Sequence, residues 1–276
     1  MMLVRGLFGV AALLLGGCSS AHMAIREVPQ PPVSLKTADV LDAAPDATVA
    51  RPLVLHLRHR GLTTDLMYPL KNDAVPAARY HVTFDDLNVL RMSIQQMPVD
   101  LRILTAERGQ LLAIADTYTG GAHCCYTSTV LDVTGSGMHR AVSKDWGNFS
   151  YRPINARDRS GYVFLTADNA GAYAFASYAE SAFPVLIESY RDGRFADVTG
   201  EYPAIVARDA AKWWREYALG SRSVVAPEAA LAAYLADEYR LGRAEQGWAR
   251  VHAQRGLAKD FDAKARAWLK DSGYAK

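Results

Sequence analysis

The fold of this chain is decided by GQLLAIAD, residues 109–116, in which a turn glycine leads into a nearly continuous apolar run ending at Asp116. A short apolar run bounded by turn residues is typical of a β-strand. The stretch aligns without gaps to GYVFLTAD, residues 161–168, and a loop containing glycine follows each copy. Beyond these loops, residues 130–132 (VLD) match residues 186–188 (LIE). This self-similarity predicts two similar β units of about fifty residues each.

Outward from these units, apolar residues alternate with polar ones in residues 52–57, 89–94 and 99–104, and Gly, Asn and Asp recur between the runs. Alternation with frequent turn residues predicts antiparallel sheets. We therefore expect a β domain over residues 51–199. Because two units cannot close a propeller, the expected architecture is a partial propeller or a layered antiparallel sheet.

From residue 200 onward the apolar period changes to that of helices. Pro203 and Pro227 stand where first helical turns are expected, and Gly220 and Gly242 end the two patterns. Two further helical patterns, each containing tryptophan, follow. Tryptophans at helical spacing are more typical of packing between helices than of sugar stacking. We expect a helical subdomain over residues 200–276, which makes the whole chain α+β.

The N-terminus has the layout of a secretory signal. Arg5 precedes an uncharged apolar run at residues 7–15, which is too short to span a membrane. The run closes with LGGC, residues 15–18, which resembles the lipobox of bacterial lipoproteins. The resemblance implies that the signal peptide, residues 1–17, is removed and that Cys18 is acylated with diacylglycerol and a fatty acyl chain such as palmitate.

The anchor is followed by a proline-containing segment. Residues 18–50 hold four prolines among Ala, Thr, Asp and Val, with little periodic pattern. We expect this segment to be a lipidated tether, which reaches on the order of 30 Å from the membrane. Ser19, by resemblance to enteric sorting rules, favours the outer membrane over the inner one, with the protein facing the periplasm.

Composition and motifs exclude several classes of function. The formal net charge is +2, and the absence of a basic cluster argues against nucleic acid as a partner. The sequence holds no Gly-x-Ser-x-Gly, His-Glu-x-x-His, phosphate-loop or dinucleotide motif. These absences favour a binding protein over an enzyme. We expect no cofactor, and we expect the membrane and a protein of the cell envelope as partners.

The first of the two aligned loops carries GGAHCCY, residues 120–126, with two of the three cysteines of the chain. Adjacent Cα atoms are about 3.8 Å apart, whereas disulfides prefer about 5.5 to 6 Å. A disulfide between Cys124 and Cys125 therefore requires a turn and a distorted or cis peptide, and Gly120 and Gly121 make such a turn credible. A vicinal disulfide of this kind either serves as a redox group or forms a rigid knob on a pocket rim.

Two other uses of this loop stay open. His123, Cys124 and Cys125 are ligands that Cu(I) or Zn(II) accepts. Adjacent residues seldom chelate one ion, so His81 or His139 would have to complete such a site. The third use is a nucleophilic cysteine with His123 as its base, although neighbouring residues on a strand point apart.

Asp116 and Asp168 end the two aligned strands, each beside a loop that contains glycine. Two carboxylates in equivalent positions could face one cleft and take part in acid–base chemistry. Aspartates beside turns more often cap them, by accepting hydrogen bonds from backbone amides.

The run DTYTGGAHCC, residues 116–125, is followed by FADVT, residues 195–199, and then by a helix rich in Ala, Asp and Trp. This combination resembles a group of secreted bacterial proteins of unknown function, and the resemblance implies a shared structural device without a particular activity. The strand–loop–strand units also resemble blades of integrin-type repeat propellers, in which an Asp-rich turn can bind calcium. Residues 155–161 form the corresponding turn, where two arginines replace the oxygen ligands that calcium requires.

These patterns predict a lipid-anchored periplasmic protein that acts as a non-enzymatic binding or envelope-assembly module. The motif loop would shape the contact surface together with two neighbouring carboxylates. The residues concerned are Gly120, Gly121, His123, Asp116 and Asp168. The alternative is thiol-redox or soft-metal handling at residues 123–125.

Overall fold

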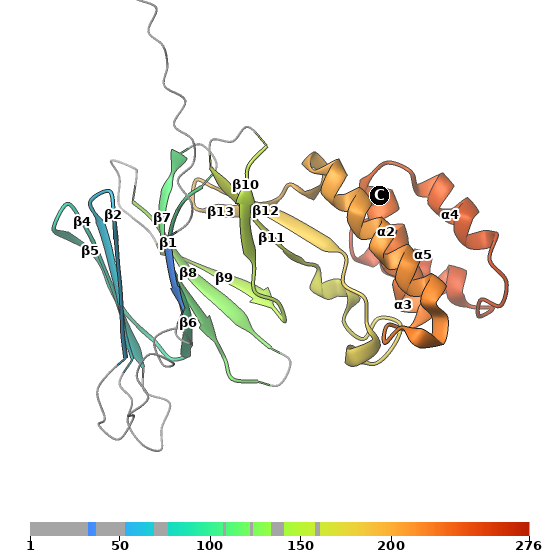
Figure 1. Ribbon diagram of the computed structural model, residues 1–276, viewed down its shortest axis with the longest axis horizontal. Helices are drawn as coiled ribbons and strands as arrows, with labels where there is room; N and C mark the ends of the chain where they lie inside the picture. The colour runs from blue at the N-terminus through green and yellow to red at the C-terminus, as the bar shows by residue number, and fades with distance from the viewer. Residues whose placement is uncertain are drawn as a thin grey trace, which may run out of the picture.

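The computed structural model describes residues 33–36, 53–68, 77–106, 109–121, 124–133, 141–157 and 161–275. These residues form three antiparallel sheets and four α-helices, so the expected α+β class is confirmed. The sheets and the helices follow one another as layers, in the order of the chain (Figure 1). The predicted signal peptide and Cys18 lie outside the described residues.

The first sheet is a meander made of β2 (Leu53–His59), β3 (Leu62–Tyr68), β4 (Ala78–Phe84) and β5 (Leu87–Ile94). Alternate side chains point inward, and Leu55, Leu66 and Tyr80, which lie opposite one another on β2, β3 and β4, are buried. The β2–β3 hairpin turns at Arg60 and Gly61, whose φ angles of 48° and 77° suit a tight two-residue turn. This pattern leaves the other face of the sheet to solvent.

The second sheet has the strand order β1-β6-β7-β8-β9. Its strands are β1 (Val33–Lys36), β6 (Met97–Thr105), β7 (Leu111–Tyr118), β8 (Tyr126–Asp132) and β9 (Ala141–Gly147). It lies between the other two sheets, which explains why β7 is almost continuously apolar. Ala113 and Ala115 pack into the core shared with the first sheet, whereas Leu112 and Ile114 pack into the core shared with the third.

Strand β1 falls inside the segment that was expected to be a tether. Val33 lies opposite Ile103 of β6, and Lys36 lies opposite Asp100. Part of residues 18–50 therefore belongs to the sheet. Its four residues, VSLK, are too few to show a repeated period, and pairing with a distant strand decides their structure.

The third sheet is a second meander, made of β10 (Arg152–Asn155), β11 (Tyr162–Ala167), β12 (Val185–Arg191) and β13 (Arg194–Asp197). Its two central strands, β11 and β12, pair with the same register as β7 and β8 of the second sheet. Ala113 lies opposite Leu131, and the aligned residues Leu165 and Ile187 also lie opposite each other. The sequence alignment therefore matches residues with the same place in both pairs.

The two strand pairs face each other across one core. Leu112 and Phe164 occupy aligned positions, and both lie in the core between the second and third sheets. In a propeller, successive blades are related by rotation about one axis, so aligned residues of neighbouring blades would face the same way around the ring. The sheets are therefore layered, and they are not successive blades.

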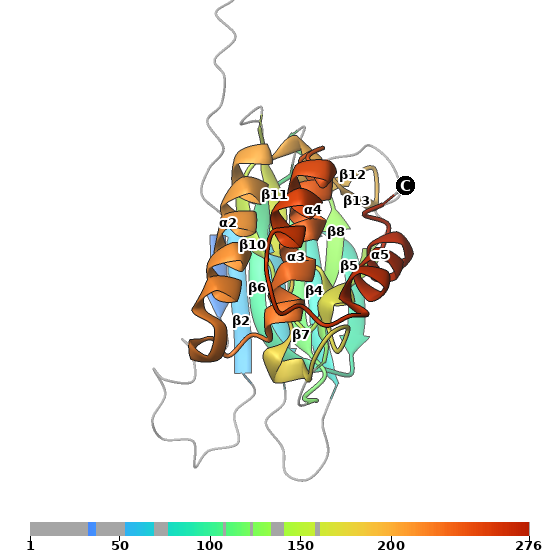
Figure 2. The same cartoon turned by 90° about the vertical axis from the view of Figure 1, so that its right-hand side faces the viewer.

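The C-terminal layer consists of α2 (Pro203–Leu219), α3 (Pro227–Arg240), α4 (Ala244–His252) and α5 (Phe261–Asp271), which cover the third sheet (Figure 2). Val206 of α2 packs with Val163 and Ile187 of this sheet. Trp213 and Trp248 are buried in the core of the helical layer, as their spacing indicated. None of the helices in the described part of the chain combines the length and apolar composition needed to cross a membrane.

Candidate functional site

The loop between β7 and β8 contains a disulfide between Cys124 and Cys125, and the peptide bond between these residues is cis. Cys124 is exposed and Cys125 is half-buried. Gly120 has a φ of 87°, which disfavours any residue with a side chain. A Cβ atom on Gly121 would lie 2.6 Å from the carbonyl oxygen of Cys124. Both glycines are therefore required by the turn that brings the sulfur atoms together.

Thr119 fastens this loop to the end of β7. Its hydroxyl accepts a hydrogen bond of 2.7 Å from the backbone N–H of Cys125 and donates one to the carbonyl of Cys124. Its own N–H donates to the carbonyl of Cys125 at 3.2 Å. The Tyr118 hydroxyl donates to the carbonyl of Gly121. Neither Thr119 nor Tyr118 was singled out in the sequence, because nothing in the pattern shows that a hydroxyl bridges the loop.

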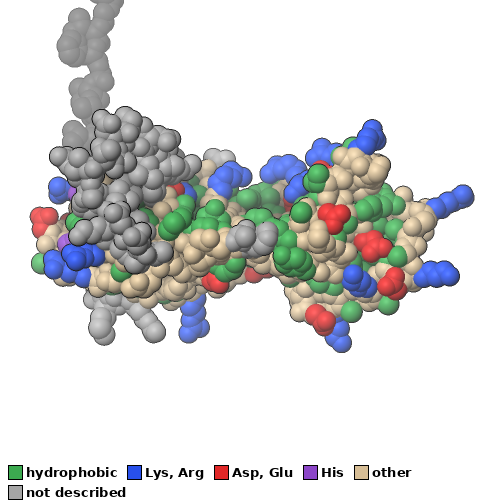
Figure 3. Space-filling model, turned by 90° about the horizontal axis from the view of Figure 1, so that it is seen from below, with side chains coloured by type: hydrophobic (Ala, Val, Ile, Leu, Met, Phe, Trp, Pro, Cys, Tyr) green, Lys and Arg blue, Asp and Glu red, His purple; other side chains and the backbone are tan. Residues whose placement is uncertain are grey.

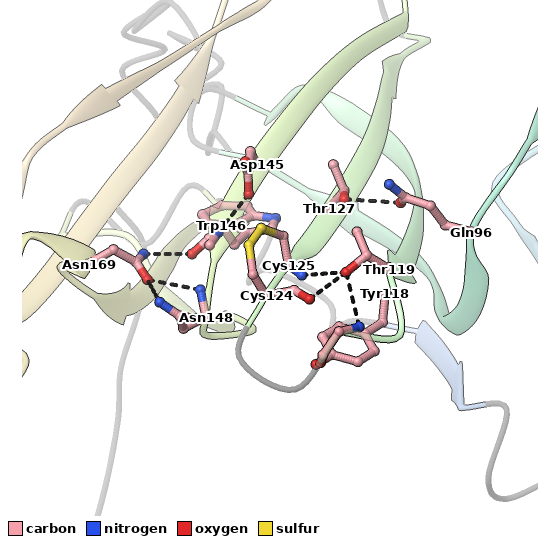
Figure 4. The surroundings of a disulfide bond; sticks show 12 residues. Gln96, Tyr118, Thr119, Cys124, Cys125, Thr127, Asp145, Trp146, Asn148 and Asn169 are labelled. Atoms are coloured by element: carbon pink, nitrogen blue, oxygen red, sulfur yellow. Dashed lines mark hydrogen bonds between the residues drawn. A yellow bond between two sulfur atoms is a disulfide. The ribbon is translucent and has the colours of Figure 1, made fainter. Parts of the chain in front are cut away.

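The surroundings of the disulfide include the loop that follows β11 (Figure 4). Asn169, in the short 3-10 helix η2 (Asn169–Gly171), donates to the Trp146 carbonyl at 2.8 Å. Its side-chain oxygen accepts from the backbone and the side chain of Asn148, at 2.8 and 2.9 Å. Asn169 therefore joins the aligned loop of the third sheet to the end of β9.

Beside the disulfide loop lies a cavity of about 380 Å³ between the second and third sheets. Tyr126, which directly follows Cys125, forms part of its wall. The remaining lining residues are Val99, Asp100, Arg102, Asp116, Thr127, Trp146, Ser150, Tyr151, Arg152 and Pro153.

Three charged residues of β6 and β7 form the floor of this cavity. The guanidinium of Arg102 contacts Asp100 at 2.6 Å and Asp116 at 2.9 Å. Asp116 also accepts hydrogen bonds from the hydroxyls of Tyr151, at 3.1 Å, and Ser128. Arg102 and Asp100 were missed in the sequence, although an Asp-x-Arg pattern places both side chains on one face of a strand.

Burial dominates the electrostatics of this network. It raises the pKa of Asp116 above the ordinary carboxyl value, while the positive charge of Arg102 and the hydrogen bond from Ser128 act in the opposite direction. Burial also raises the pKa of the Tyr151 hydroxyl well above its usual value, and the neighbouring Asp116 adds to this shift. Tyr151 is therefore a hydrogen-bond donor at neutral pH.

Asp168 does not share this cavity with Asp116. It caps η2 by accepting from the backbone N–H of Ala170 at 2.9 Å, as the turn interpretation indicated. It also accepts a hydrogen bond of 2.6 Å from the Tyr274 hydroxyl and lies 3.7 Å from Arg240. The two aligned carboxylates therefore have different partners and different surroundings.

The described residues give no support to a metal centre. Within them, no three His, Cys, Asp or Glu residues come together as metal ligands. His81 instead contacts Asn88 at 3.0 Å, in the first sheet. His123 and His139 lie outside the described residues.

Comparison with known proteins finds two curated relatives. A probable thylakoid lumen protein of Synechocystis sp. is 32% identical over 152 residues, which cover 48% of this chain and 40% of the relative. An uncharacterized protein of Sinorhizobium fredii is 28% identical over 164 residues, which cover 55% of this chain and 25% of the relative. The matched segments thus span less than half the length of either relative. No protein-family model and no solved structure matches the chain.

Proposed function

We propose that the protein is a non-enzymatic binding or envelope-assembly module, anchored by lipid at Cys18 to the outer membrane and facing the periplasm. The secretory signal and the lipobox support this location. The relative described as a probable thylakoid lumen protein supports an extracytoplasmic compartment. The disulfide agrees with both, since disulfides persist in oxidising compartments.

The observation that best supports a binding role is the preformed cavity beside the disulfide loop. Arg102 is held between two carboxylates, so the floor of the cavity is ordered before any ligand arrives. A preformed wall lowers the entropic cost of recognition. The same pairing leaves these carboxylates engaged, and this argues against a role as free acid–base groups.

Capture from crosslinked envelopes tests this proposal. The full-length protein should recover a reproducible partner, and the variant Cys124→Ser/Cys125→Ser should lose it because the rim beside Tyr126 is no longer fixed. Lys259→Gln, at an exposed position outside the cavity, is the matched control and should retain the partner. Failure to recover any reproducible partner, or equal capture by the double variant, would count against the proposal.

A thiol-redox or soft-metal role at residues 123–125 is the second candidate, and the exposure of Cys124 favours it. A redox disulfide must be reached by a reductant or a partner thiol. Intact-mass spectrometry with and without reductant and alkylation decides between the states. Two thiols that are permanently reduced and free of metal would exclude both forms of this candidate.

We also propose that the second and third sheets contain two similar units. The shared register of β7–β8 and β11–β12 supports this. The resemblance of residues 116–125 to secreted proteins of unknown function is consistent with a structural role for the first loop. Structures of relatives that share both loops would test the proposal, because a true repeat keeps the two registers equal.

A further inference from the structure

The outward face of the first sheet carries an unusual set of side chains. Because the strands are in register, these side chains form three rows across the sheet. The rows are Val54, Met67, Arg79 and Ser93, then His56, Asp65, His81 and Arg91, and last Arg58, Thr63, Thr83 and Asn88.

These rows are strongly biased toward positive charge. Arg58, Arg79 and Arg91 are exposed, and none of them forms a salt bridge with another residue that the structure describes. Asp65 is the single carboxylate in the rows, and it is held by two histidines. His56 contacts it at 2.5 Å, and His81 lies 3.8 Å away.

The face also has apolar side chains and a shallow hollow. Val54 is 46% exposed and Met67 is 38% exposed. They line an open depression of about 680 Å³ together with Asp65, Arg79, His81 and Arg91. Figure 3 views this end of the molecule from the side and shows a few basic, histidine and acidic side chains at its edge.

We propose that this face binds anionic, phosphate-bearing lipid headgroups, so that the domain lies against the membrane that holds its anchor. The proposal rests on the proposed lipid anchor. Arginines near a negatively charged membrane are attracted to it, and exposed apolar side chains between them enter the interfacial region. Between Cys18 and β2 the chain forms β1, the edge strand of the second sheet, and β1 contacts β2, the edge strand of the first sheet. The chain that follows the anchor therefore enters the fold next to the first sheet, which keeps this sheet near the membrane.

A vesicle experiment separates the face from the anchor. The full chain carrying Cys18→Ser, which lacks the acylation site, is mixed with vesicles of phosphatidylcholine alone or of phosphatidylcholine with phosphatidylglycerol, and co-sedimentation is measured. The protein should bind the anionic vesicles only. Adding Arg79→Gln/Arg91→Gln should lower the partition coefficient by roughly thirtyfold, since each basic residue near an anionic surface contributes about a factor of five.

The matched control removes two arginines from the opposite end of the molecule. Arg208→Gln/Arg215→Gln changes net charge equally at exposed positions of α2, and it should leave vesicle binding within about twofold. Equal losses in both double variants, or equal binding to neutral and anionic vesicles, would overturn the proposal. Release by inorganic phosphate but not by chloride at equal ionic strength would show a soluble-phosphate site instead. Failure of the anchor itself would appear separately, as wild-type protein without acyl mass at Cys18.

Discussion

The second and third sheets use the same strand pairing but differ in the loops that follow their aligned aspartates. After Asp116 the chain makes the exposed disulfide loop, which is held mainly by its own backbone and Thr119. After Asp168 the chain forms η2 and η3 (Tyr178–Glu180), and this loop is fastened to the helices. The indole of Trp268 in α5 donates to the Ala170 carbonyl at 2.8 Å, and Tyr274 donates to Asp168.

This difference shows that the same strand pairing can either expose the following loop to solvent or attach it to another layer of the protein. In the second sheet, the carboxylate is directed into a buried ion network and the loop remains accessible. In the third sheet, the carboxylate and its loop connect the β layers to the helical layer. The disulfide loop is therefore the better candidate for contact with a partner.

Identical substitutions at the aligned aspartates give the largest expected contrast. Asp116→Asn removes one of the two carboxylate charges that hold Arg102 inside the protein, and breaking a buried ion pair costs about 3 to 5 kcal/mol of the free energy of unfolding. Asp168→Asn keeps an oxygen that can accept from Ala170 or Tyr274, so it should cost only about 1 kcal/mol. Urea denaturation of both variants measures the contrast.

If both variants lost the same amount of stability, the buried network of Asp116 would contribute no more to the fold than the partly exposed contacts of Asp168. If Asp116→Asn fails to bind a partner, this failure reports on the cavity only at urea concentrations and temperatures at which the variant remains folded. Circular dichroism on the same samples provides that control.

Within the described structure, Asp237 is a buried carboxylate that lacks an arginine network like the one around Asp116. We expect it to make the stability of the helical layer depend on pH. Asp237 of α3 is fully buried, and the carboxyl of Asp209 lies beside it, at hydrogen-bonding reach when Asp237 is protonated. Burial raises its pKa to about 9, the nearby Asp209 adds to the shift, and Arg240 opposes it. In the unfolded chain the pKa returns to about 3.9.

The folded state therefore keeps a proton that the unfolded state releases between about pH 4 and pH 9. Stability from this group is complete below pH 4 and falls as pH rises, by at most about 1.4 kcal/mol per pH unit. Asp237→Asn should gain stability relative to the wild type as pH increases from 5 to 8. The exposed Asp271→Asn is the control, and a constant difference between wild type and Asp237→Asn across this range would contradict the assignment.

Much of this architecture was predictable, because it depends on local periodicity. The two aligned strands, the α+β class and the helices that begin at Pro203 and Pro227 were all indicated. Proline at a first turn and glycine after a last turn act within a few residues, so a single sequence reveals them.

The remaining features depend on contacts between distant residues. Strand β1 has a partner far along the chain, and the first sheet includes β3 and β4, which the sequence did not single out. The Arg102 network joins β6, β7, β8 and the segment before β10, and no local pattern reports such a meeting. Asp237 lies on a helix whose burial on nearly all sides follows from packing between layers.

A third comparison concerns one glycine in each of the two aligned loops, because both glycines lie close to a backbone carbonyl. A Cβ atom on Gly171 would overlap the Ala182 carbonyl oxygen, inside the loop that attaches the helices. Gly171→Ala should therefore cost about 3 kcal/mol, the upper range for overpacking. Gly121→Ala also meets a carbonyl, at 2.6 Å, but it can displace an exposed loop and should cost less than about 1 kcal/mol.

Gly200→Ala provides the steric control, since nothing lies within 4 Å of the added Cβ position. Its free energy of unfolding should stay within about 0.5 kcal/mol of the wild type. If Gly121→Ala destabilised the protein as much as Gly171→Ala, the disulfide loop would have to be an integral part of the fold.

Removing the disulfide itself should have only a small effect on stability. Cys124→Ser/Cys125→Ser opens a ring between neighbouring residues, and the entropy that a crosslink removes from the unfolded chain increases with the length of the loop it closes. We therefore expect a loss of only about 1 kcal/mol in urea denaturation, comparable with Trp268→Phe, which removes one hydrogen bond from the aligned loop. The two variants should differ in binding, because only the serine variant alters the loop that precedes Tyr126 in the cavity wall. A loss as large as that of Asp116→Asn would mean that the disulfide supports the buried network, and the contrast between a presented loop and an attached loop would fail.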